Sequence, residues 1–143
     1  MSTNENFSRL VFILPVFNGA STILETVNSL LAQLEILIEV IIIDNGSTDE
    51  TLSVINSIQD ERIVLHSMPH TKSLGESLNR ALNLKVEPPF CICHADDVYE
   101  EFFALEMIKN MQKYPDADVL FCQAKIIDKN SMPVWSLKNL SKN

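Results

Sequence analysis

Two adjacent carboxylates, Asp96 and Asp97, follow an apolar run over residues 90–93. Neighbouring carboxylates repel each other unless a cation lies between or beside them. A hard divalent cation is a natural partner, and Mg²⁺ or Mn²⁺ held by one or two carboxylates usually completes its coordination shell with substrate phosphates. The pair could equally cap the helix that follows it. One interpretation predicts a divalent-metal site at Asp96 and Asp97, and the other predicts only a helix cap.

Polar residues follow two further apolar runs in the same way. Asp44 and Asn45 come after the run over residues 40–43, and both side chains could exchange hydrogen bonds with a base or a ribose. The next residues, Gly46 and Ser47, also suit a turn and a helix cap, so the local pattern alone favours a turn. Residues 15–18 follow the run over residues 10–14, and together with the other strand ends they could form one wall of a pocket.

The apolar runs predict strands, and the segments between them predict helices. Short runs that are apolar throughout are typical of strands buried on both faces of a sheet. They cover residues 10–14, 40–43, 62–65, 90–93 and 119–122, the last extending as far as 127. Apolar residues at helical spacing predict helices over residues 23–34, 49–58, 74–82 and 104–111. Two capping boxes, Thr22 with Glu25 and Ser47 with Glu50, would open the first two helices.

This alternation predicts one domain of the α/β class. Strands that alternate with helices form right-handed βαβ units, so we expect a Rossmann-like, mainly parallel sheet with flanking helices. A length of 143 residues suits a single domain. In open α/β sheets, ligands bind beyond the carboxyl ends of the strands, so the three polar segments are expected to meet at one edge of the sheet.

Composition and missing motifs exclude several classes of protein. A net charge of −8 without a basic stripe excludes a nucleic-acid binder. No membrane segment is visible, because the longest apolar stretch, residues 36–43, is too short to span a bilayer. Three sparse cysteines argue against a disulfide framework and for a reducing compartment, so we expect a cytoplasmic location, with Cys91 and Cys93 as core thiols. The glycine fingerprints of dinucleotide-binding folds, P-loops and nucleophile elbows are all missing.

Taken together, the strand ends resemble those of the family 2 glycosyltransferases, which are inverting, use nucleotide-sugar donors and have the A-type glycosyltransferase fold. The resemblance covers roughly residues 9–130 and rests on segments that occur in the family's order. They are Phe-Ile-Leu-Pro-Val-Phe-Asn at 12–18, Ser-Leu-Leu-Ala-Gln at 29–33, Glu-Val-Ile-Ile-Ile-Asp-Asn-Gly-Ser-Thr-Asp at 39–49, Ser-Leu-Asn-Arg at 77–80 and His-Ala-Asp-Asp at 94–97. Each segment is weakly specific, whereas the ordered set is strongly specific.

The resemblance implies a nucleotide-sugar site, with a UDP-sugar as the expected donor. The implied donor-binding residues are Pro15, Val16, Phe17, Asn18, Asp44, Asn45, Lys72 and Asp96, and the implied ligands of Mn²⁺ or Mg²⁺ are Asp96 and Asp97. The metal would neutralise the departing diphosphate, which explains how a chain of charge −8 could hold an anionic donor.

Three positions depart from the family's pattern. Asn45 replaces the second Asp of a usual pair, and Ser73 stands where glycine is common. His94 replaces the first Asp of an Asp-x-Asp motif, and histidine is a poorer partner for Mg²⁺ than for Mn²⁺.

The resemblance also implies that this fold is truncated. Family members usually continue for about half this length or more, and that part carries the acceptor site and the general base that inversion needs. We therefore expect a disordered arm over residues 1–8, a donor-binding domain over 9–130 that is incomplete on its C-terminal side, and a tail over 131–143. The catalytic base is expected to be absent from this chain, and the acceptor is unknown.

Two consequences complete the expectations. A non-catalytic binding module on the same fold is the alternative function, favoured by the missing base and by the substitutions at Asn45 and His94. A fifth strand at an open sheet edge would expose backbone groups and apolar surface, which predicts self-association. Polysaccharide synthesis at the cell envelope is an expectation from the family alone.

Overall fold

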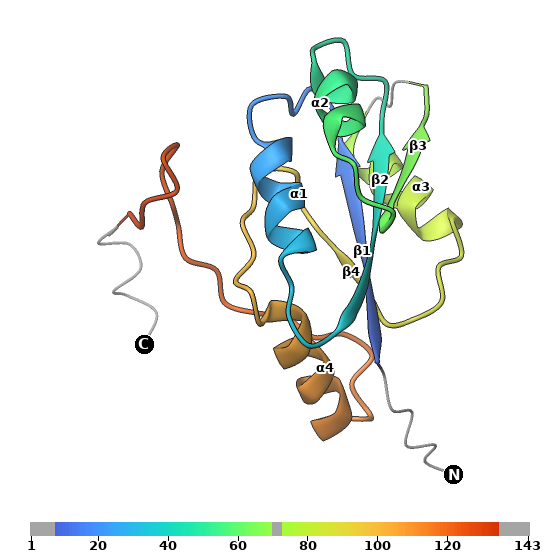
Figure 1. Cartoon of the computed structure of the whole chain (residues 1–143). Helices are drawn as coiled ribbons and strands as arrows, with labels where there is room; N and C mark the ends of the chain where they lie inside the picture. The colour runs from blue at the N-terminus through green and yellow to red at the C-terminus, as the bar shows by residue number, and fades with distance from the viewer. Residues whose placement is uncertain (1–7, 70–72, 135–143) are drawn as a thin grey trace.

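A computed structural model describes residues 8–69 and 73–134 of the chain (Figure 1). Four strands alternate with four helices. In chain order they are β1 (Arg9–Val16), α1 (Ile23–Leu31), β2 (Leu37–Asp44), α2 (Thr51–Ser57), β3 (Ile63–Ser67), α3 (Leu74–Asn83), β4 (Phe90–Ile92) and α4 (Phe103–Lys113). The strands form one sheet in the order β3-β2-β1-β4, and every pairing is parallel. The predicted α/β class with a parallel sheet is confirmed.

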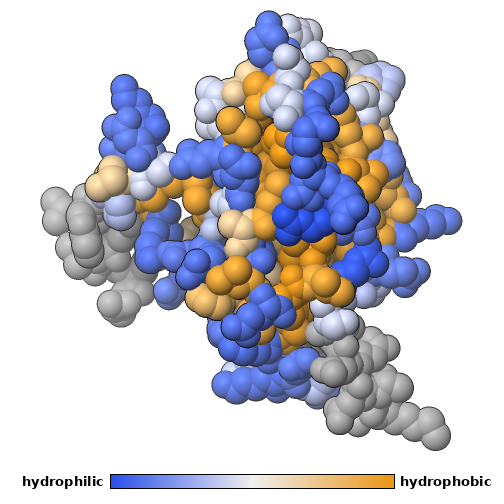
Figure 2. All heavy atoms as spheres, in the orientation of Figure 1, coloured by the Kyte–Doolittle hydropathy of each residue, from blue (hydrophilic) through white to orange (hydrophobic). Residues whose placement is uncertain are grey.

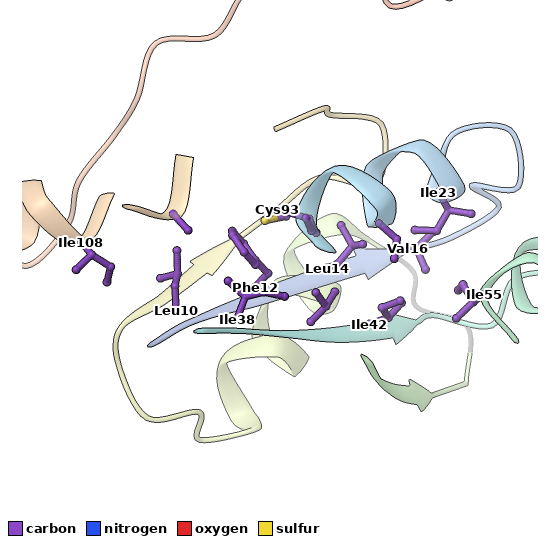
Figure 3. Packing of buried hydrophobic residues seen from close by; sticks show 14 residues of the cluster. Leu10, Phe12, Leu14, Val16, Ile23, Ile38, Ile42, Ile55, Cys93 and Ile108 are labelled. Carbon is purple, nitrogen blue, oxygen red and sulfur yellow. The ribbon is translucent and has the colours of Figure 1, made fainter. Parts of the chain in front are cut away.

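The sheet separates two layers of apolar side chains. Alternate residues of β1, such as Phe12 and Leu14, face a large cluster that also holds buried residues of α1, α2 and α4 (Figure 3). The residues between them, Val11 and Ile13, face a smaller cluster that includes Ala81 of α3. Because successive side chains of a strand point to opposite faces, an apolar run without alternation is what a doubly covered strand needs.

Register places the ends of the two central strands side by side. Val16, the last residue of β1, pairs with Asp44, the last residue of β2. The shorter β4 pairs with the middle of β1, where Ile92 lies opposite Ile13. The polar segments that follow β1, β2 and β4 therefore leave the sheet at the same edge.

The helix starts differ from the predicted capping boxes. Thr22 precedes α1, but its side chain caps no backbone amide of that helix, and its hydroxyl donates instead to the carbonyl of Gly19. Helix α2 begins only at Thr51, and the residue before it, Glu50, makes no side-chain cap. Both predicted boxes are wrong: the Thr22 hydroxyl bonds to Gly19, and the Ser47 hydroxyl accepts from the amide of Asn18 and does not cap α2.

The predicted fifth strand is also wrong within the described chain. Residues 116–126 run without regular structure, and only an isolated bridge between Ile127 and Pro133 follows. This segment leaves α4 and ends in the orange-red arm of Figure 1. Phe121 is 91% exposed, because a groove of about 1010 Å³ separates its segment from β4. The segment lacks the neighbouring strand that a sheet residue needs.

The surface mixes polar and apolar groups. Figure 2 shows apolar side chains lying between polar ones across the middle of this face. Among the described residues, no helix is both long and apolar enough to cross a membrane.

Candidate functional site

The loops that follow β1 and β2 are bonded to each other. Asn18 has a left-handed backbone, with φ of 51°, and its amide donates to the Ser47 hydroxyl at 2.9 Å. Its side-chain oxygen accepts from the backbone amide of Thr48 at 2.8 Å. The backbone amide of Asn45 donates to the carbonyl of Val16 at 2.9 Å. These bonds turn two exposed loops into one bonded unit at the carboxyl edge of the sheet.

A second pair of contacts anchors this unit to α2. The Thr51 hydroxyl accepts from the backbone amide of Gly19 at 2.9 Å and donates to the Asp49 carboxylate. Asp49 also accepts from the backbone amide of Ala20 at 3.2 Å. The Thr51 hydroxyl is the main cause that holds the pKa of Asp49 below its ordinary value. Thr51 is fully buried, and sequence reasoning missed it, because its only signal was a polar residue at a buried helix start.

Asp44 is a buried carboxylate that organises its own loop. It is 1% exposed, and its oxygens accept from the backbone amides of Gly46 and Ser47, both at 3.2 Å. Gly46 has φ of 81°, a conformation that glycine adopts without strain. The turn that the local pattern favoured is therefore formed.

Asn45 is buried beside Asp44 and points toward α3. Its side-chain amide donates to the Ser77 hydroxyl at 2.7 Å and lies within 3.3 Å of the carbonyl oxygens of Val16 and Ile43. Its Oδ1 atom is buried and has no hydrogen-bond partner among the described residues. A buried acceptor without a partner costs about 1–3 kcal/mol. Ser77 lies in the segment 77–80 that carries part of the resemblance, but sequence reasoning gave it no role at this site.

The acidic pair lies on the loop after β4. Asp96 and Asp97 are both exposed, and the Asp97 backbone amide contacts the carbonyl of His94 at 3.4 Å. A Cβ atom built on Gly19 would lie 3.8 Å from the Cβ of Ala95, so the loops after β1 and β4 are neighbours. The structure thus brings all three polar segments to one edge.

The donor set of this edge suits a cation that keeps open coordination positions. Within residues 8–69 and 73–134, no group of three or more His, Cys, Asp or Glu side chains could hold a metal ion. Two exposed carboxylates fit Mg²⁺ or Mn²⁺, because those ions are bound by one or two carboxylates together with phosphates.

The remaining predicted residues are placed as follows. Pro15 is half-buried, Val16 is buried, and Phe17 is 45% exposed next to the exposed Asn18. Lys72 lies outside the described residues. The groove along the outer edge of β4 is not lined by Pro15, Val16, Phe17 or Asn18.

The three cysteines are free thiols, as expected. Cys91 lies in β4 and Cys93 directly follows that strand, with their sulfur atoms 3.9 Å apart, and Cys93 is buried. The contact with Cys91, together with burial, raises the pKa of Cys93, and burial raises the pKa of the neighbouring Tyr99 well above its usual range. These groups are un-ionised parts of the core.

Known proteins similar to this chain agree with this geometry. An uncharacterized glycosyltransferase of Rickettsia prowazekii is 31% identical over 134 residues, which are 92% of this chain and 42% of that protein. A UDP-Glc:alpha-D-GlcNAc-diphosphoundecaprenol beta-1,3-glucosyltransferase of Escherichia coli is 30% identical over 109 residues, 76% of this chain and 42% of that protein. The chain thus spans less than half the length of these two relatives.

Two solved structures share the fold. Staphylococcus aureus TarS in complex with UDP has a TM-score of 0.62 at 22% identity, over 75% of this chain and 33% of that one. A mannosyltransferase of Pyrobaculum calidifontis, in complex with GDP-Man and Mn²⁺, has a TM-score of 0.63 at 23% identity, over 77% and 33%. Both likenesses confirm the A-type glycosyltransferase fold. Residues 11–141 match glycosyl transferase family 2, and the chain belongs to that family.

Proposed function

We propose that this chain binds the nucleotide-sugar donor of a glycosyl transfer reaction at the carboxyl edge of its sheet. The observation that carries the proposal is the convergence there of residues 15–18, 44–47 and 94–97, with the first two segments bonded to each other. A parallel sheet binds ligands at that edge. The relatives are glycosyltransferases, which supports the same reaction class.

The donor we propose is a UDP-sugar. Uracil carries an imide N–H group that can donate a hydrogen bond. The Oδ1 atom of Asn45, which has no partner among the described residues, could accept that bond. Because that atom is buried, a base reaches it only when neighbouring side chains move aside. Pro15, Phe17 and Asn18 offer the more exposed surface for the rest of the nucleotide. The names of two similar proteins include UDP-Glc and UDP, which supports this choice.

Asp96 and Asp97 would hold a divalent cation, Mn²⁺ or Mg²⁺, between the protein and the diphosphate. When bound, the ion supplies Lewis-acid stabilisation of the charge that develops on the departing diphosphate. The two carboxylates would hold the ion on the loop that follows β4, beside the loop that follows β1. Inversion at the anomeric carbon requires a further carboxylate that deprotonates the acceptor hydroxyl, and we assign no residue of this chain to that role.

A non-catalytic donor-binding module is the second candidate. Asp44 accepts hydrogen bonds from backbone amides of its own loop, and the side-chain amide of Asn45 donates to Ser77. Both side chains therefore stabilise the fold even without a ligand. This candidate retains nucleotide binding without turnover.

The proposal is tested by titrating the chain with UDP in the presence of Mn²⁺ and in the presence of EDTA. We expect Mn²⁺ to tighten UDP binding, and we expect Asp97→Asn and Asp96→Asn to remove that gain. Asp116→Asn is the matched control, because it removes the same charge from an exposed position away from the strand ends. Unchanged UDP affinity with and without metal, or no binding of any nucleoside diphosphate, would refute the metal-dependent site.

Self-association through the open β4 edge belongs to the same proposal. Val119 and Phe121 are exposed beside the groove, and an edge strand with apolar neighbours can pair with another chain. Light scattering over a range of concentrations tests it, and a monomer at every concentration would contradict it.

A further inference from the structure

Two polar residues at the end of α1, Ser29 and Gln33, hold the backbone that follows the acidic pair. Ser29 lies in the last turns of α1, and Gln33 lies two residues beyond its end, where its side-chain amide donates back to the carbonyl of Ser29. Both residues meet residues 98–104, the segment that connects Asp97 to α4 and runs beside α1 in Figure 1. Neither residue contacts the strand ends themselves, so the donor site described above does not account for them.

The Ser29 hydroxyl makes one hydrogen bond as a donor and one as an acceptor. It donates to the carbonyl of Thr26 at 2.7 Å and accepts from the backbone amide of Tyr99 at 3.1 Å. The first of these bonds fixes the rotamer of the serine and therefore the direction in which its oxygen accepts a hydrogen bond. The second bond fixes the backbone two residues after Asp97.

Gln33 satisfies every polar atom of its side chain although it is only 7% exposed. Its Nε2 donates to the carbonyls of Ser29 at 3.1 Å and Glu100 at 2.8 Å. Its Oε1 accepts from the backbone amide of Ala104 at 2.7 Å. Burying an amide side chain costs free energy unless all its polar atoms are hydrogen-bonded. Gln33 meets this condition through its bonds to Glu100 and Ala104, and it thereby fixes the backbone between them.

The bond to Ala104 also replaces a missing helix cap. The residue before α4, Phe102, has no side chain that could cap the helix, and the amide of Ala104 is one that an N-cap oxygen normally satisfies. Gln33 supplies that oxygen from the loop that follows α1. A further backbone bond, from the amide of Leu34 to the carbonyl of Glu101 at 2.9 Å, joins the same two segments.

We propose that Ser29 and Gln33 are positioning residues of the metal site, which fix the loop bearing Asp96 and Asp97 so that both carboxylates meet one cation. The proposal rests on the proposed function, because it takes these carboxylates as the metal ligands. The acidic pair makes no side-chain contact that would hold it among the described residues. Its placement therefore depends on the backbone, which is anchored by β4 before the pair and by Ser29 and Gln33 after it.

The experiment measures the dissociation constant of Mn²⁺ by calorimetry in the presence of UDP, and the affinity for UDP in EDTA. Gln33→Met and Ser29→Ala are expected to weaken Mn²⁺ binding about tenfold, the lower end of what outer contacts contribute to a metal site. UDP affinity in EDTA is expected to change less than about twofold, because the loops after β1 and β2 are untouched. Gln33→Glu keeps the acceptor for Ala104 but cannot donate to Glu100 while ionised, so it separates the helix cap from the loop contact.

Two controls separate positioning from general stability. Val27→Ala removes a buried side chain of α1 and lowers thermal stability while it keeps every hydrogen bond of Ser29 and Gln33, so Mn²⁺ affinity should stay within about twofold of the unsubstituted chain. Ser29→Thr keeps the hydroxyl and should restore Mn²⁺ binding. The inference is overturned if the Ser29 and Gln33 variants bind Mn²⁺ normally, or if Val27→Ala weakens binding as much as they do. If the unsubstituted chain shows no response to Mn²⁺ while it still binds UDP, the metal assignment itself fails.

Discussion

Replacing Thr51 by valine tests whether the bonded loops at the carboxyl edge depend on one buried hydroxyl. Valine keeps the size and branching of threonine, so the core around α2 stays filled. The change leaves the amide of Gly19 without its acceptor at 2.9 Å and removes the hydroxyl donor from Asp49. An amide that loses its partner away from water costs about 1–3 kcal/mol. Gly19 is half-buried, so we expect a loss of about 2 kcal/mol in the free energy of unfolding.

The assay is urea denaturation followed by circular dichroism. With a slope of about 2 kcal/mol per molar urea, the midpoint should fall by about 1 M. Thr51→Ser is the matched variant, since it keeps the hydroxyl and loses a methyl group, and it should cost less than valine. NMR titration should also show the pKa of Asp49 rising toward its ordinary value in the valine variant, because the Thr51 hydroxyl is the main cause of its depression. If valine matches the original residue in stability, or serine proves worse than valine, the hydroxyl does not join these loops.

Three further changes probe single contacts. Gly19→Ala would place a Cβ 2.7 Å from the Val16 side chain, so a loss of about 1–3 kcal/mol is expected in the same urea assay. The Arg62 guanidinium lowers the pKa of Asp60 to about 2. The ionised Asp60 therefore contributes stability above the pKa that it has in the unfolded chain, and this contribution is lost as pH falls toward 2. In Asp60→Asn, the free energy of unfolding should depend less on pH over that acid range. Asn45→Asp would place a carboxylate beside the Val16 carbonyl, raising its folded pKa, so melting temperature should fall as pH rises.

The apolar pattern of the sequence was sufficient to predict the central strands β1 and β2, but it wrongly predicted a fifth strand over residues 119–122. The runs in β1 and β2 are apolar on both faces, and only a strand between two covering layers suits them. Residues 119–122 have the same character, yet a strand forms only where its backbone pairs with a neighbouring strand, and a groove lies between this segment and the open edge of β4. That neighbour is a property of the whole sheet, and no local pattern contains it.

The site residues divide in the same way. Position along the chain was enough to place Asp44 and Asn45 at the edge of the sheet, because residues after parallel strands meet there. Their roles depend on which face each side chain takes. Asp44 turns to its own loop amides and Asn45 turns to Ser77, choices that a list of strand-end residues does not contain. The first capping box failed for a related reason, since the Thr22 hydroxyl donates to the carbonyl of Gly19 and caps no amide of α1.

The two kinds of polar residue at this edge have opposite requirements. The exposed pair Asp96 and Asp97 is free to meet a ligand, but it gains no fixed position from contacts of its own. Buried residues such as Thr51 and Gln33 have fixed positions because each polar atom must find a partner inside the protein. A site that binds a metal nucleotide needs both, since loose carboxylates would lose part of their binding free energy in ordering the loop. For this reason the buried polar residues beneath the loops, more than the exposed ones on them, are expected to determine how tightly the edge binds its ligand.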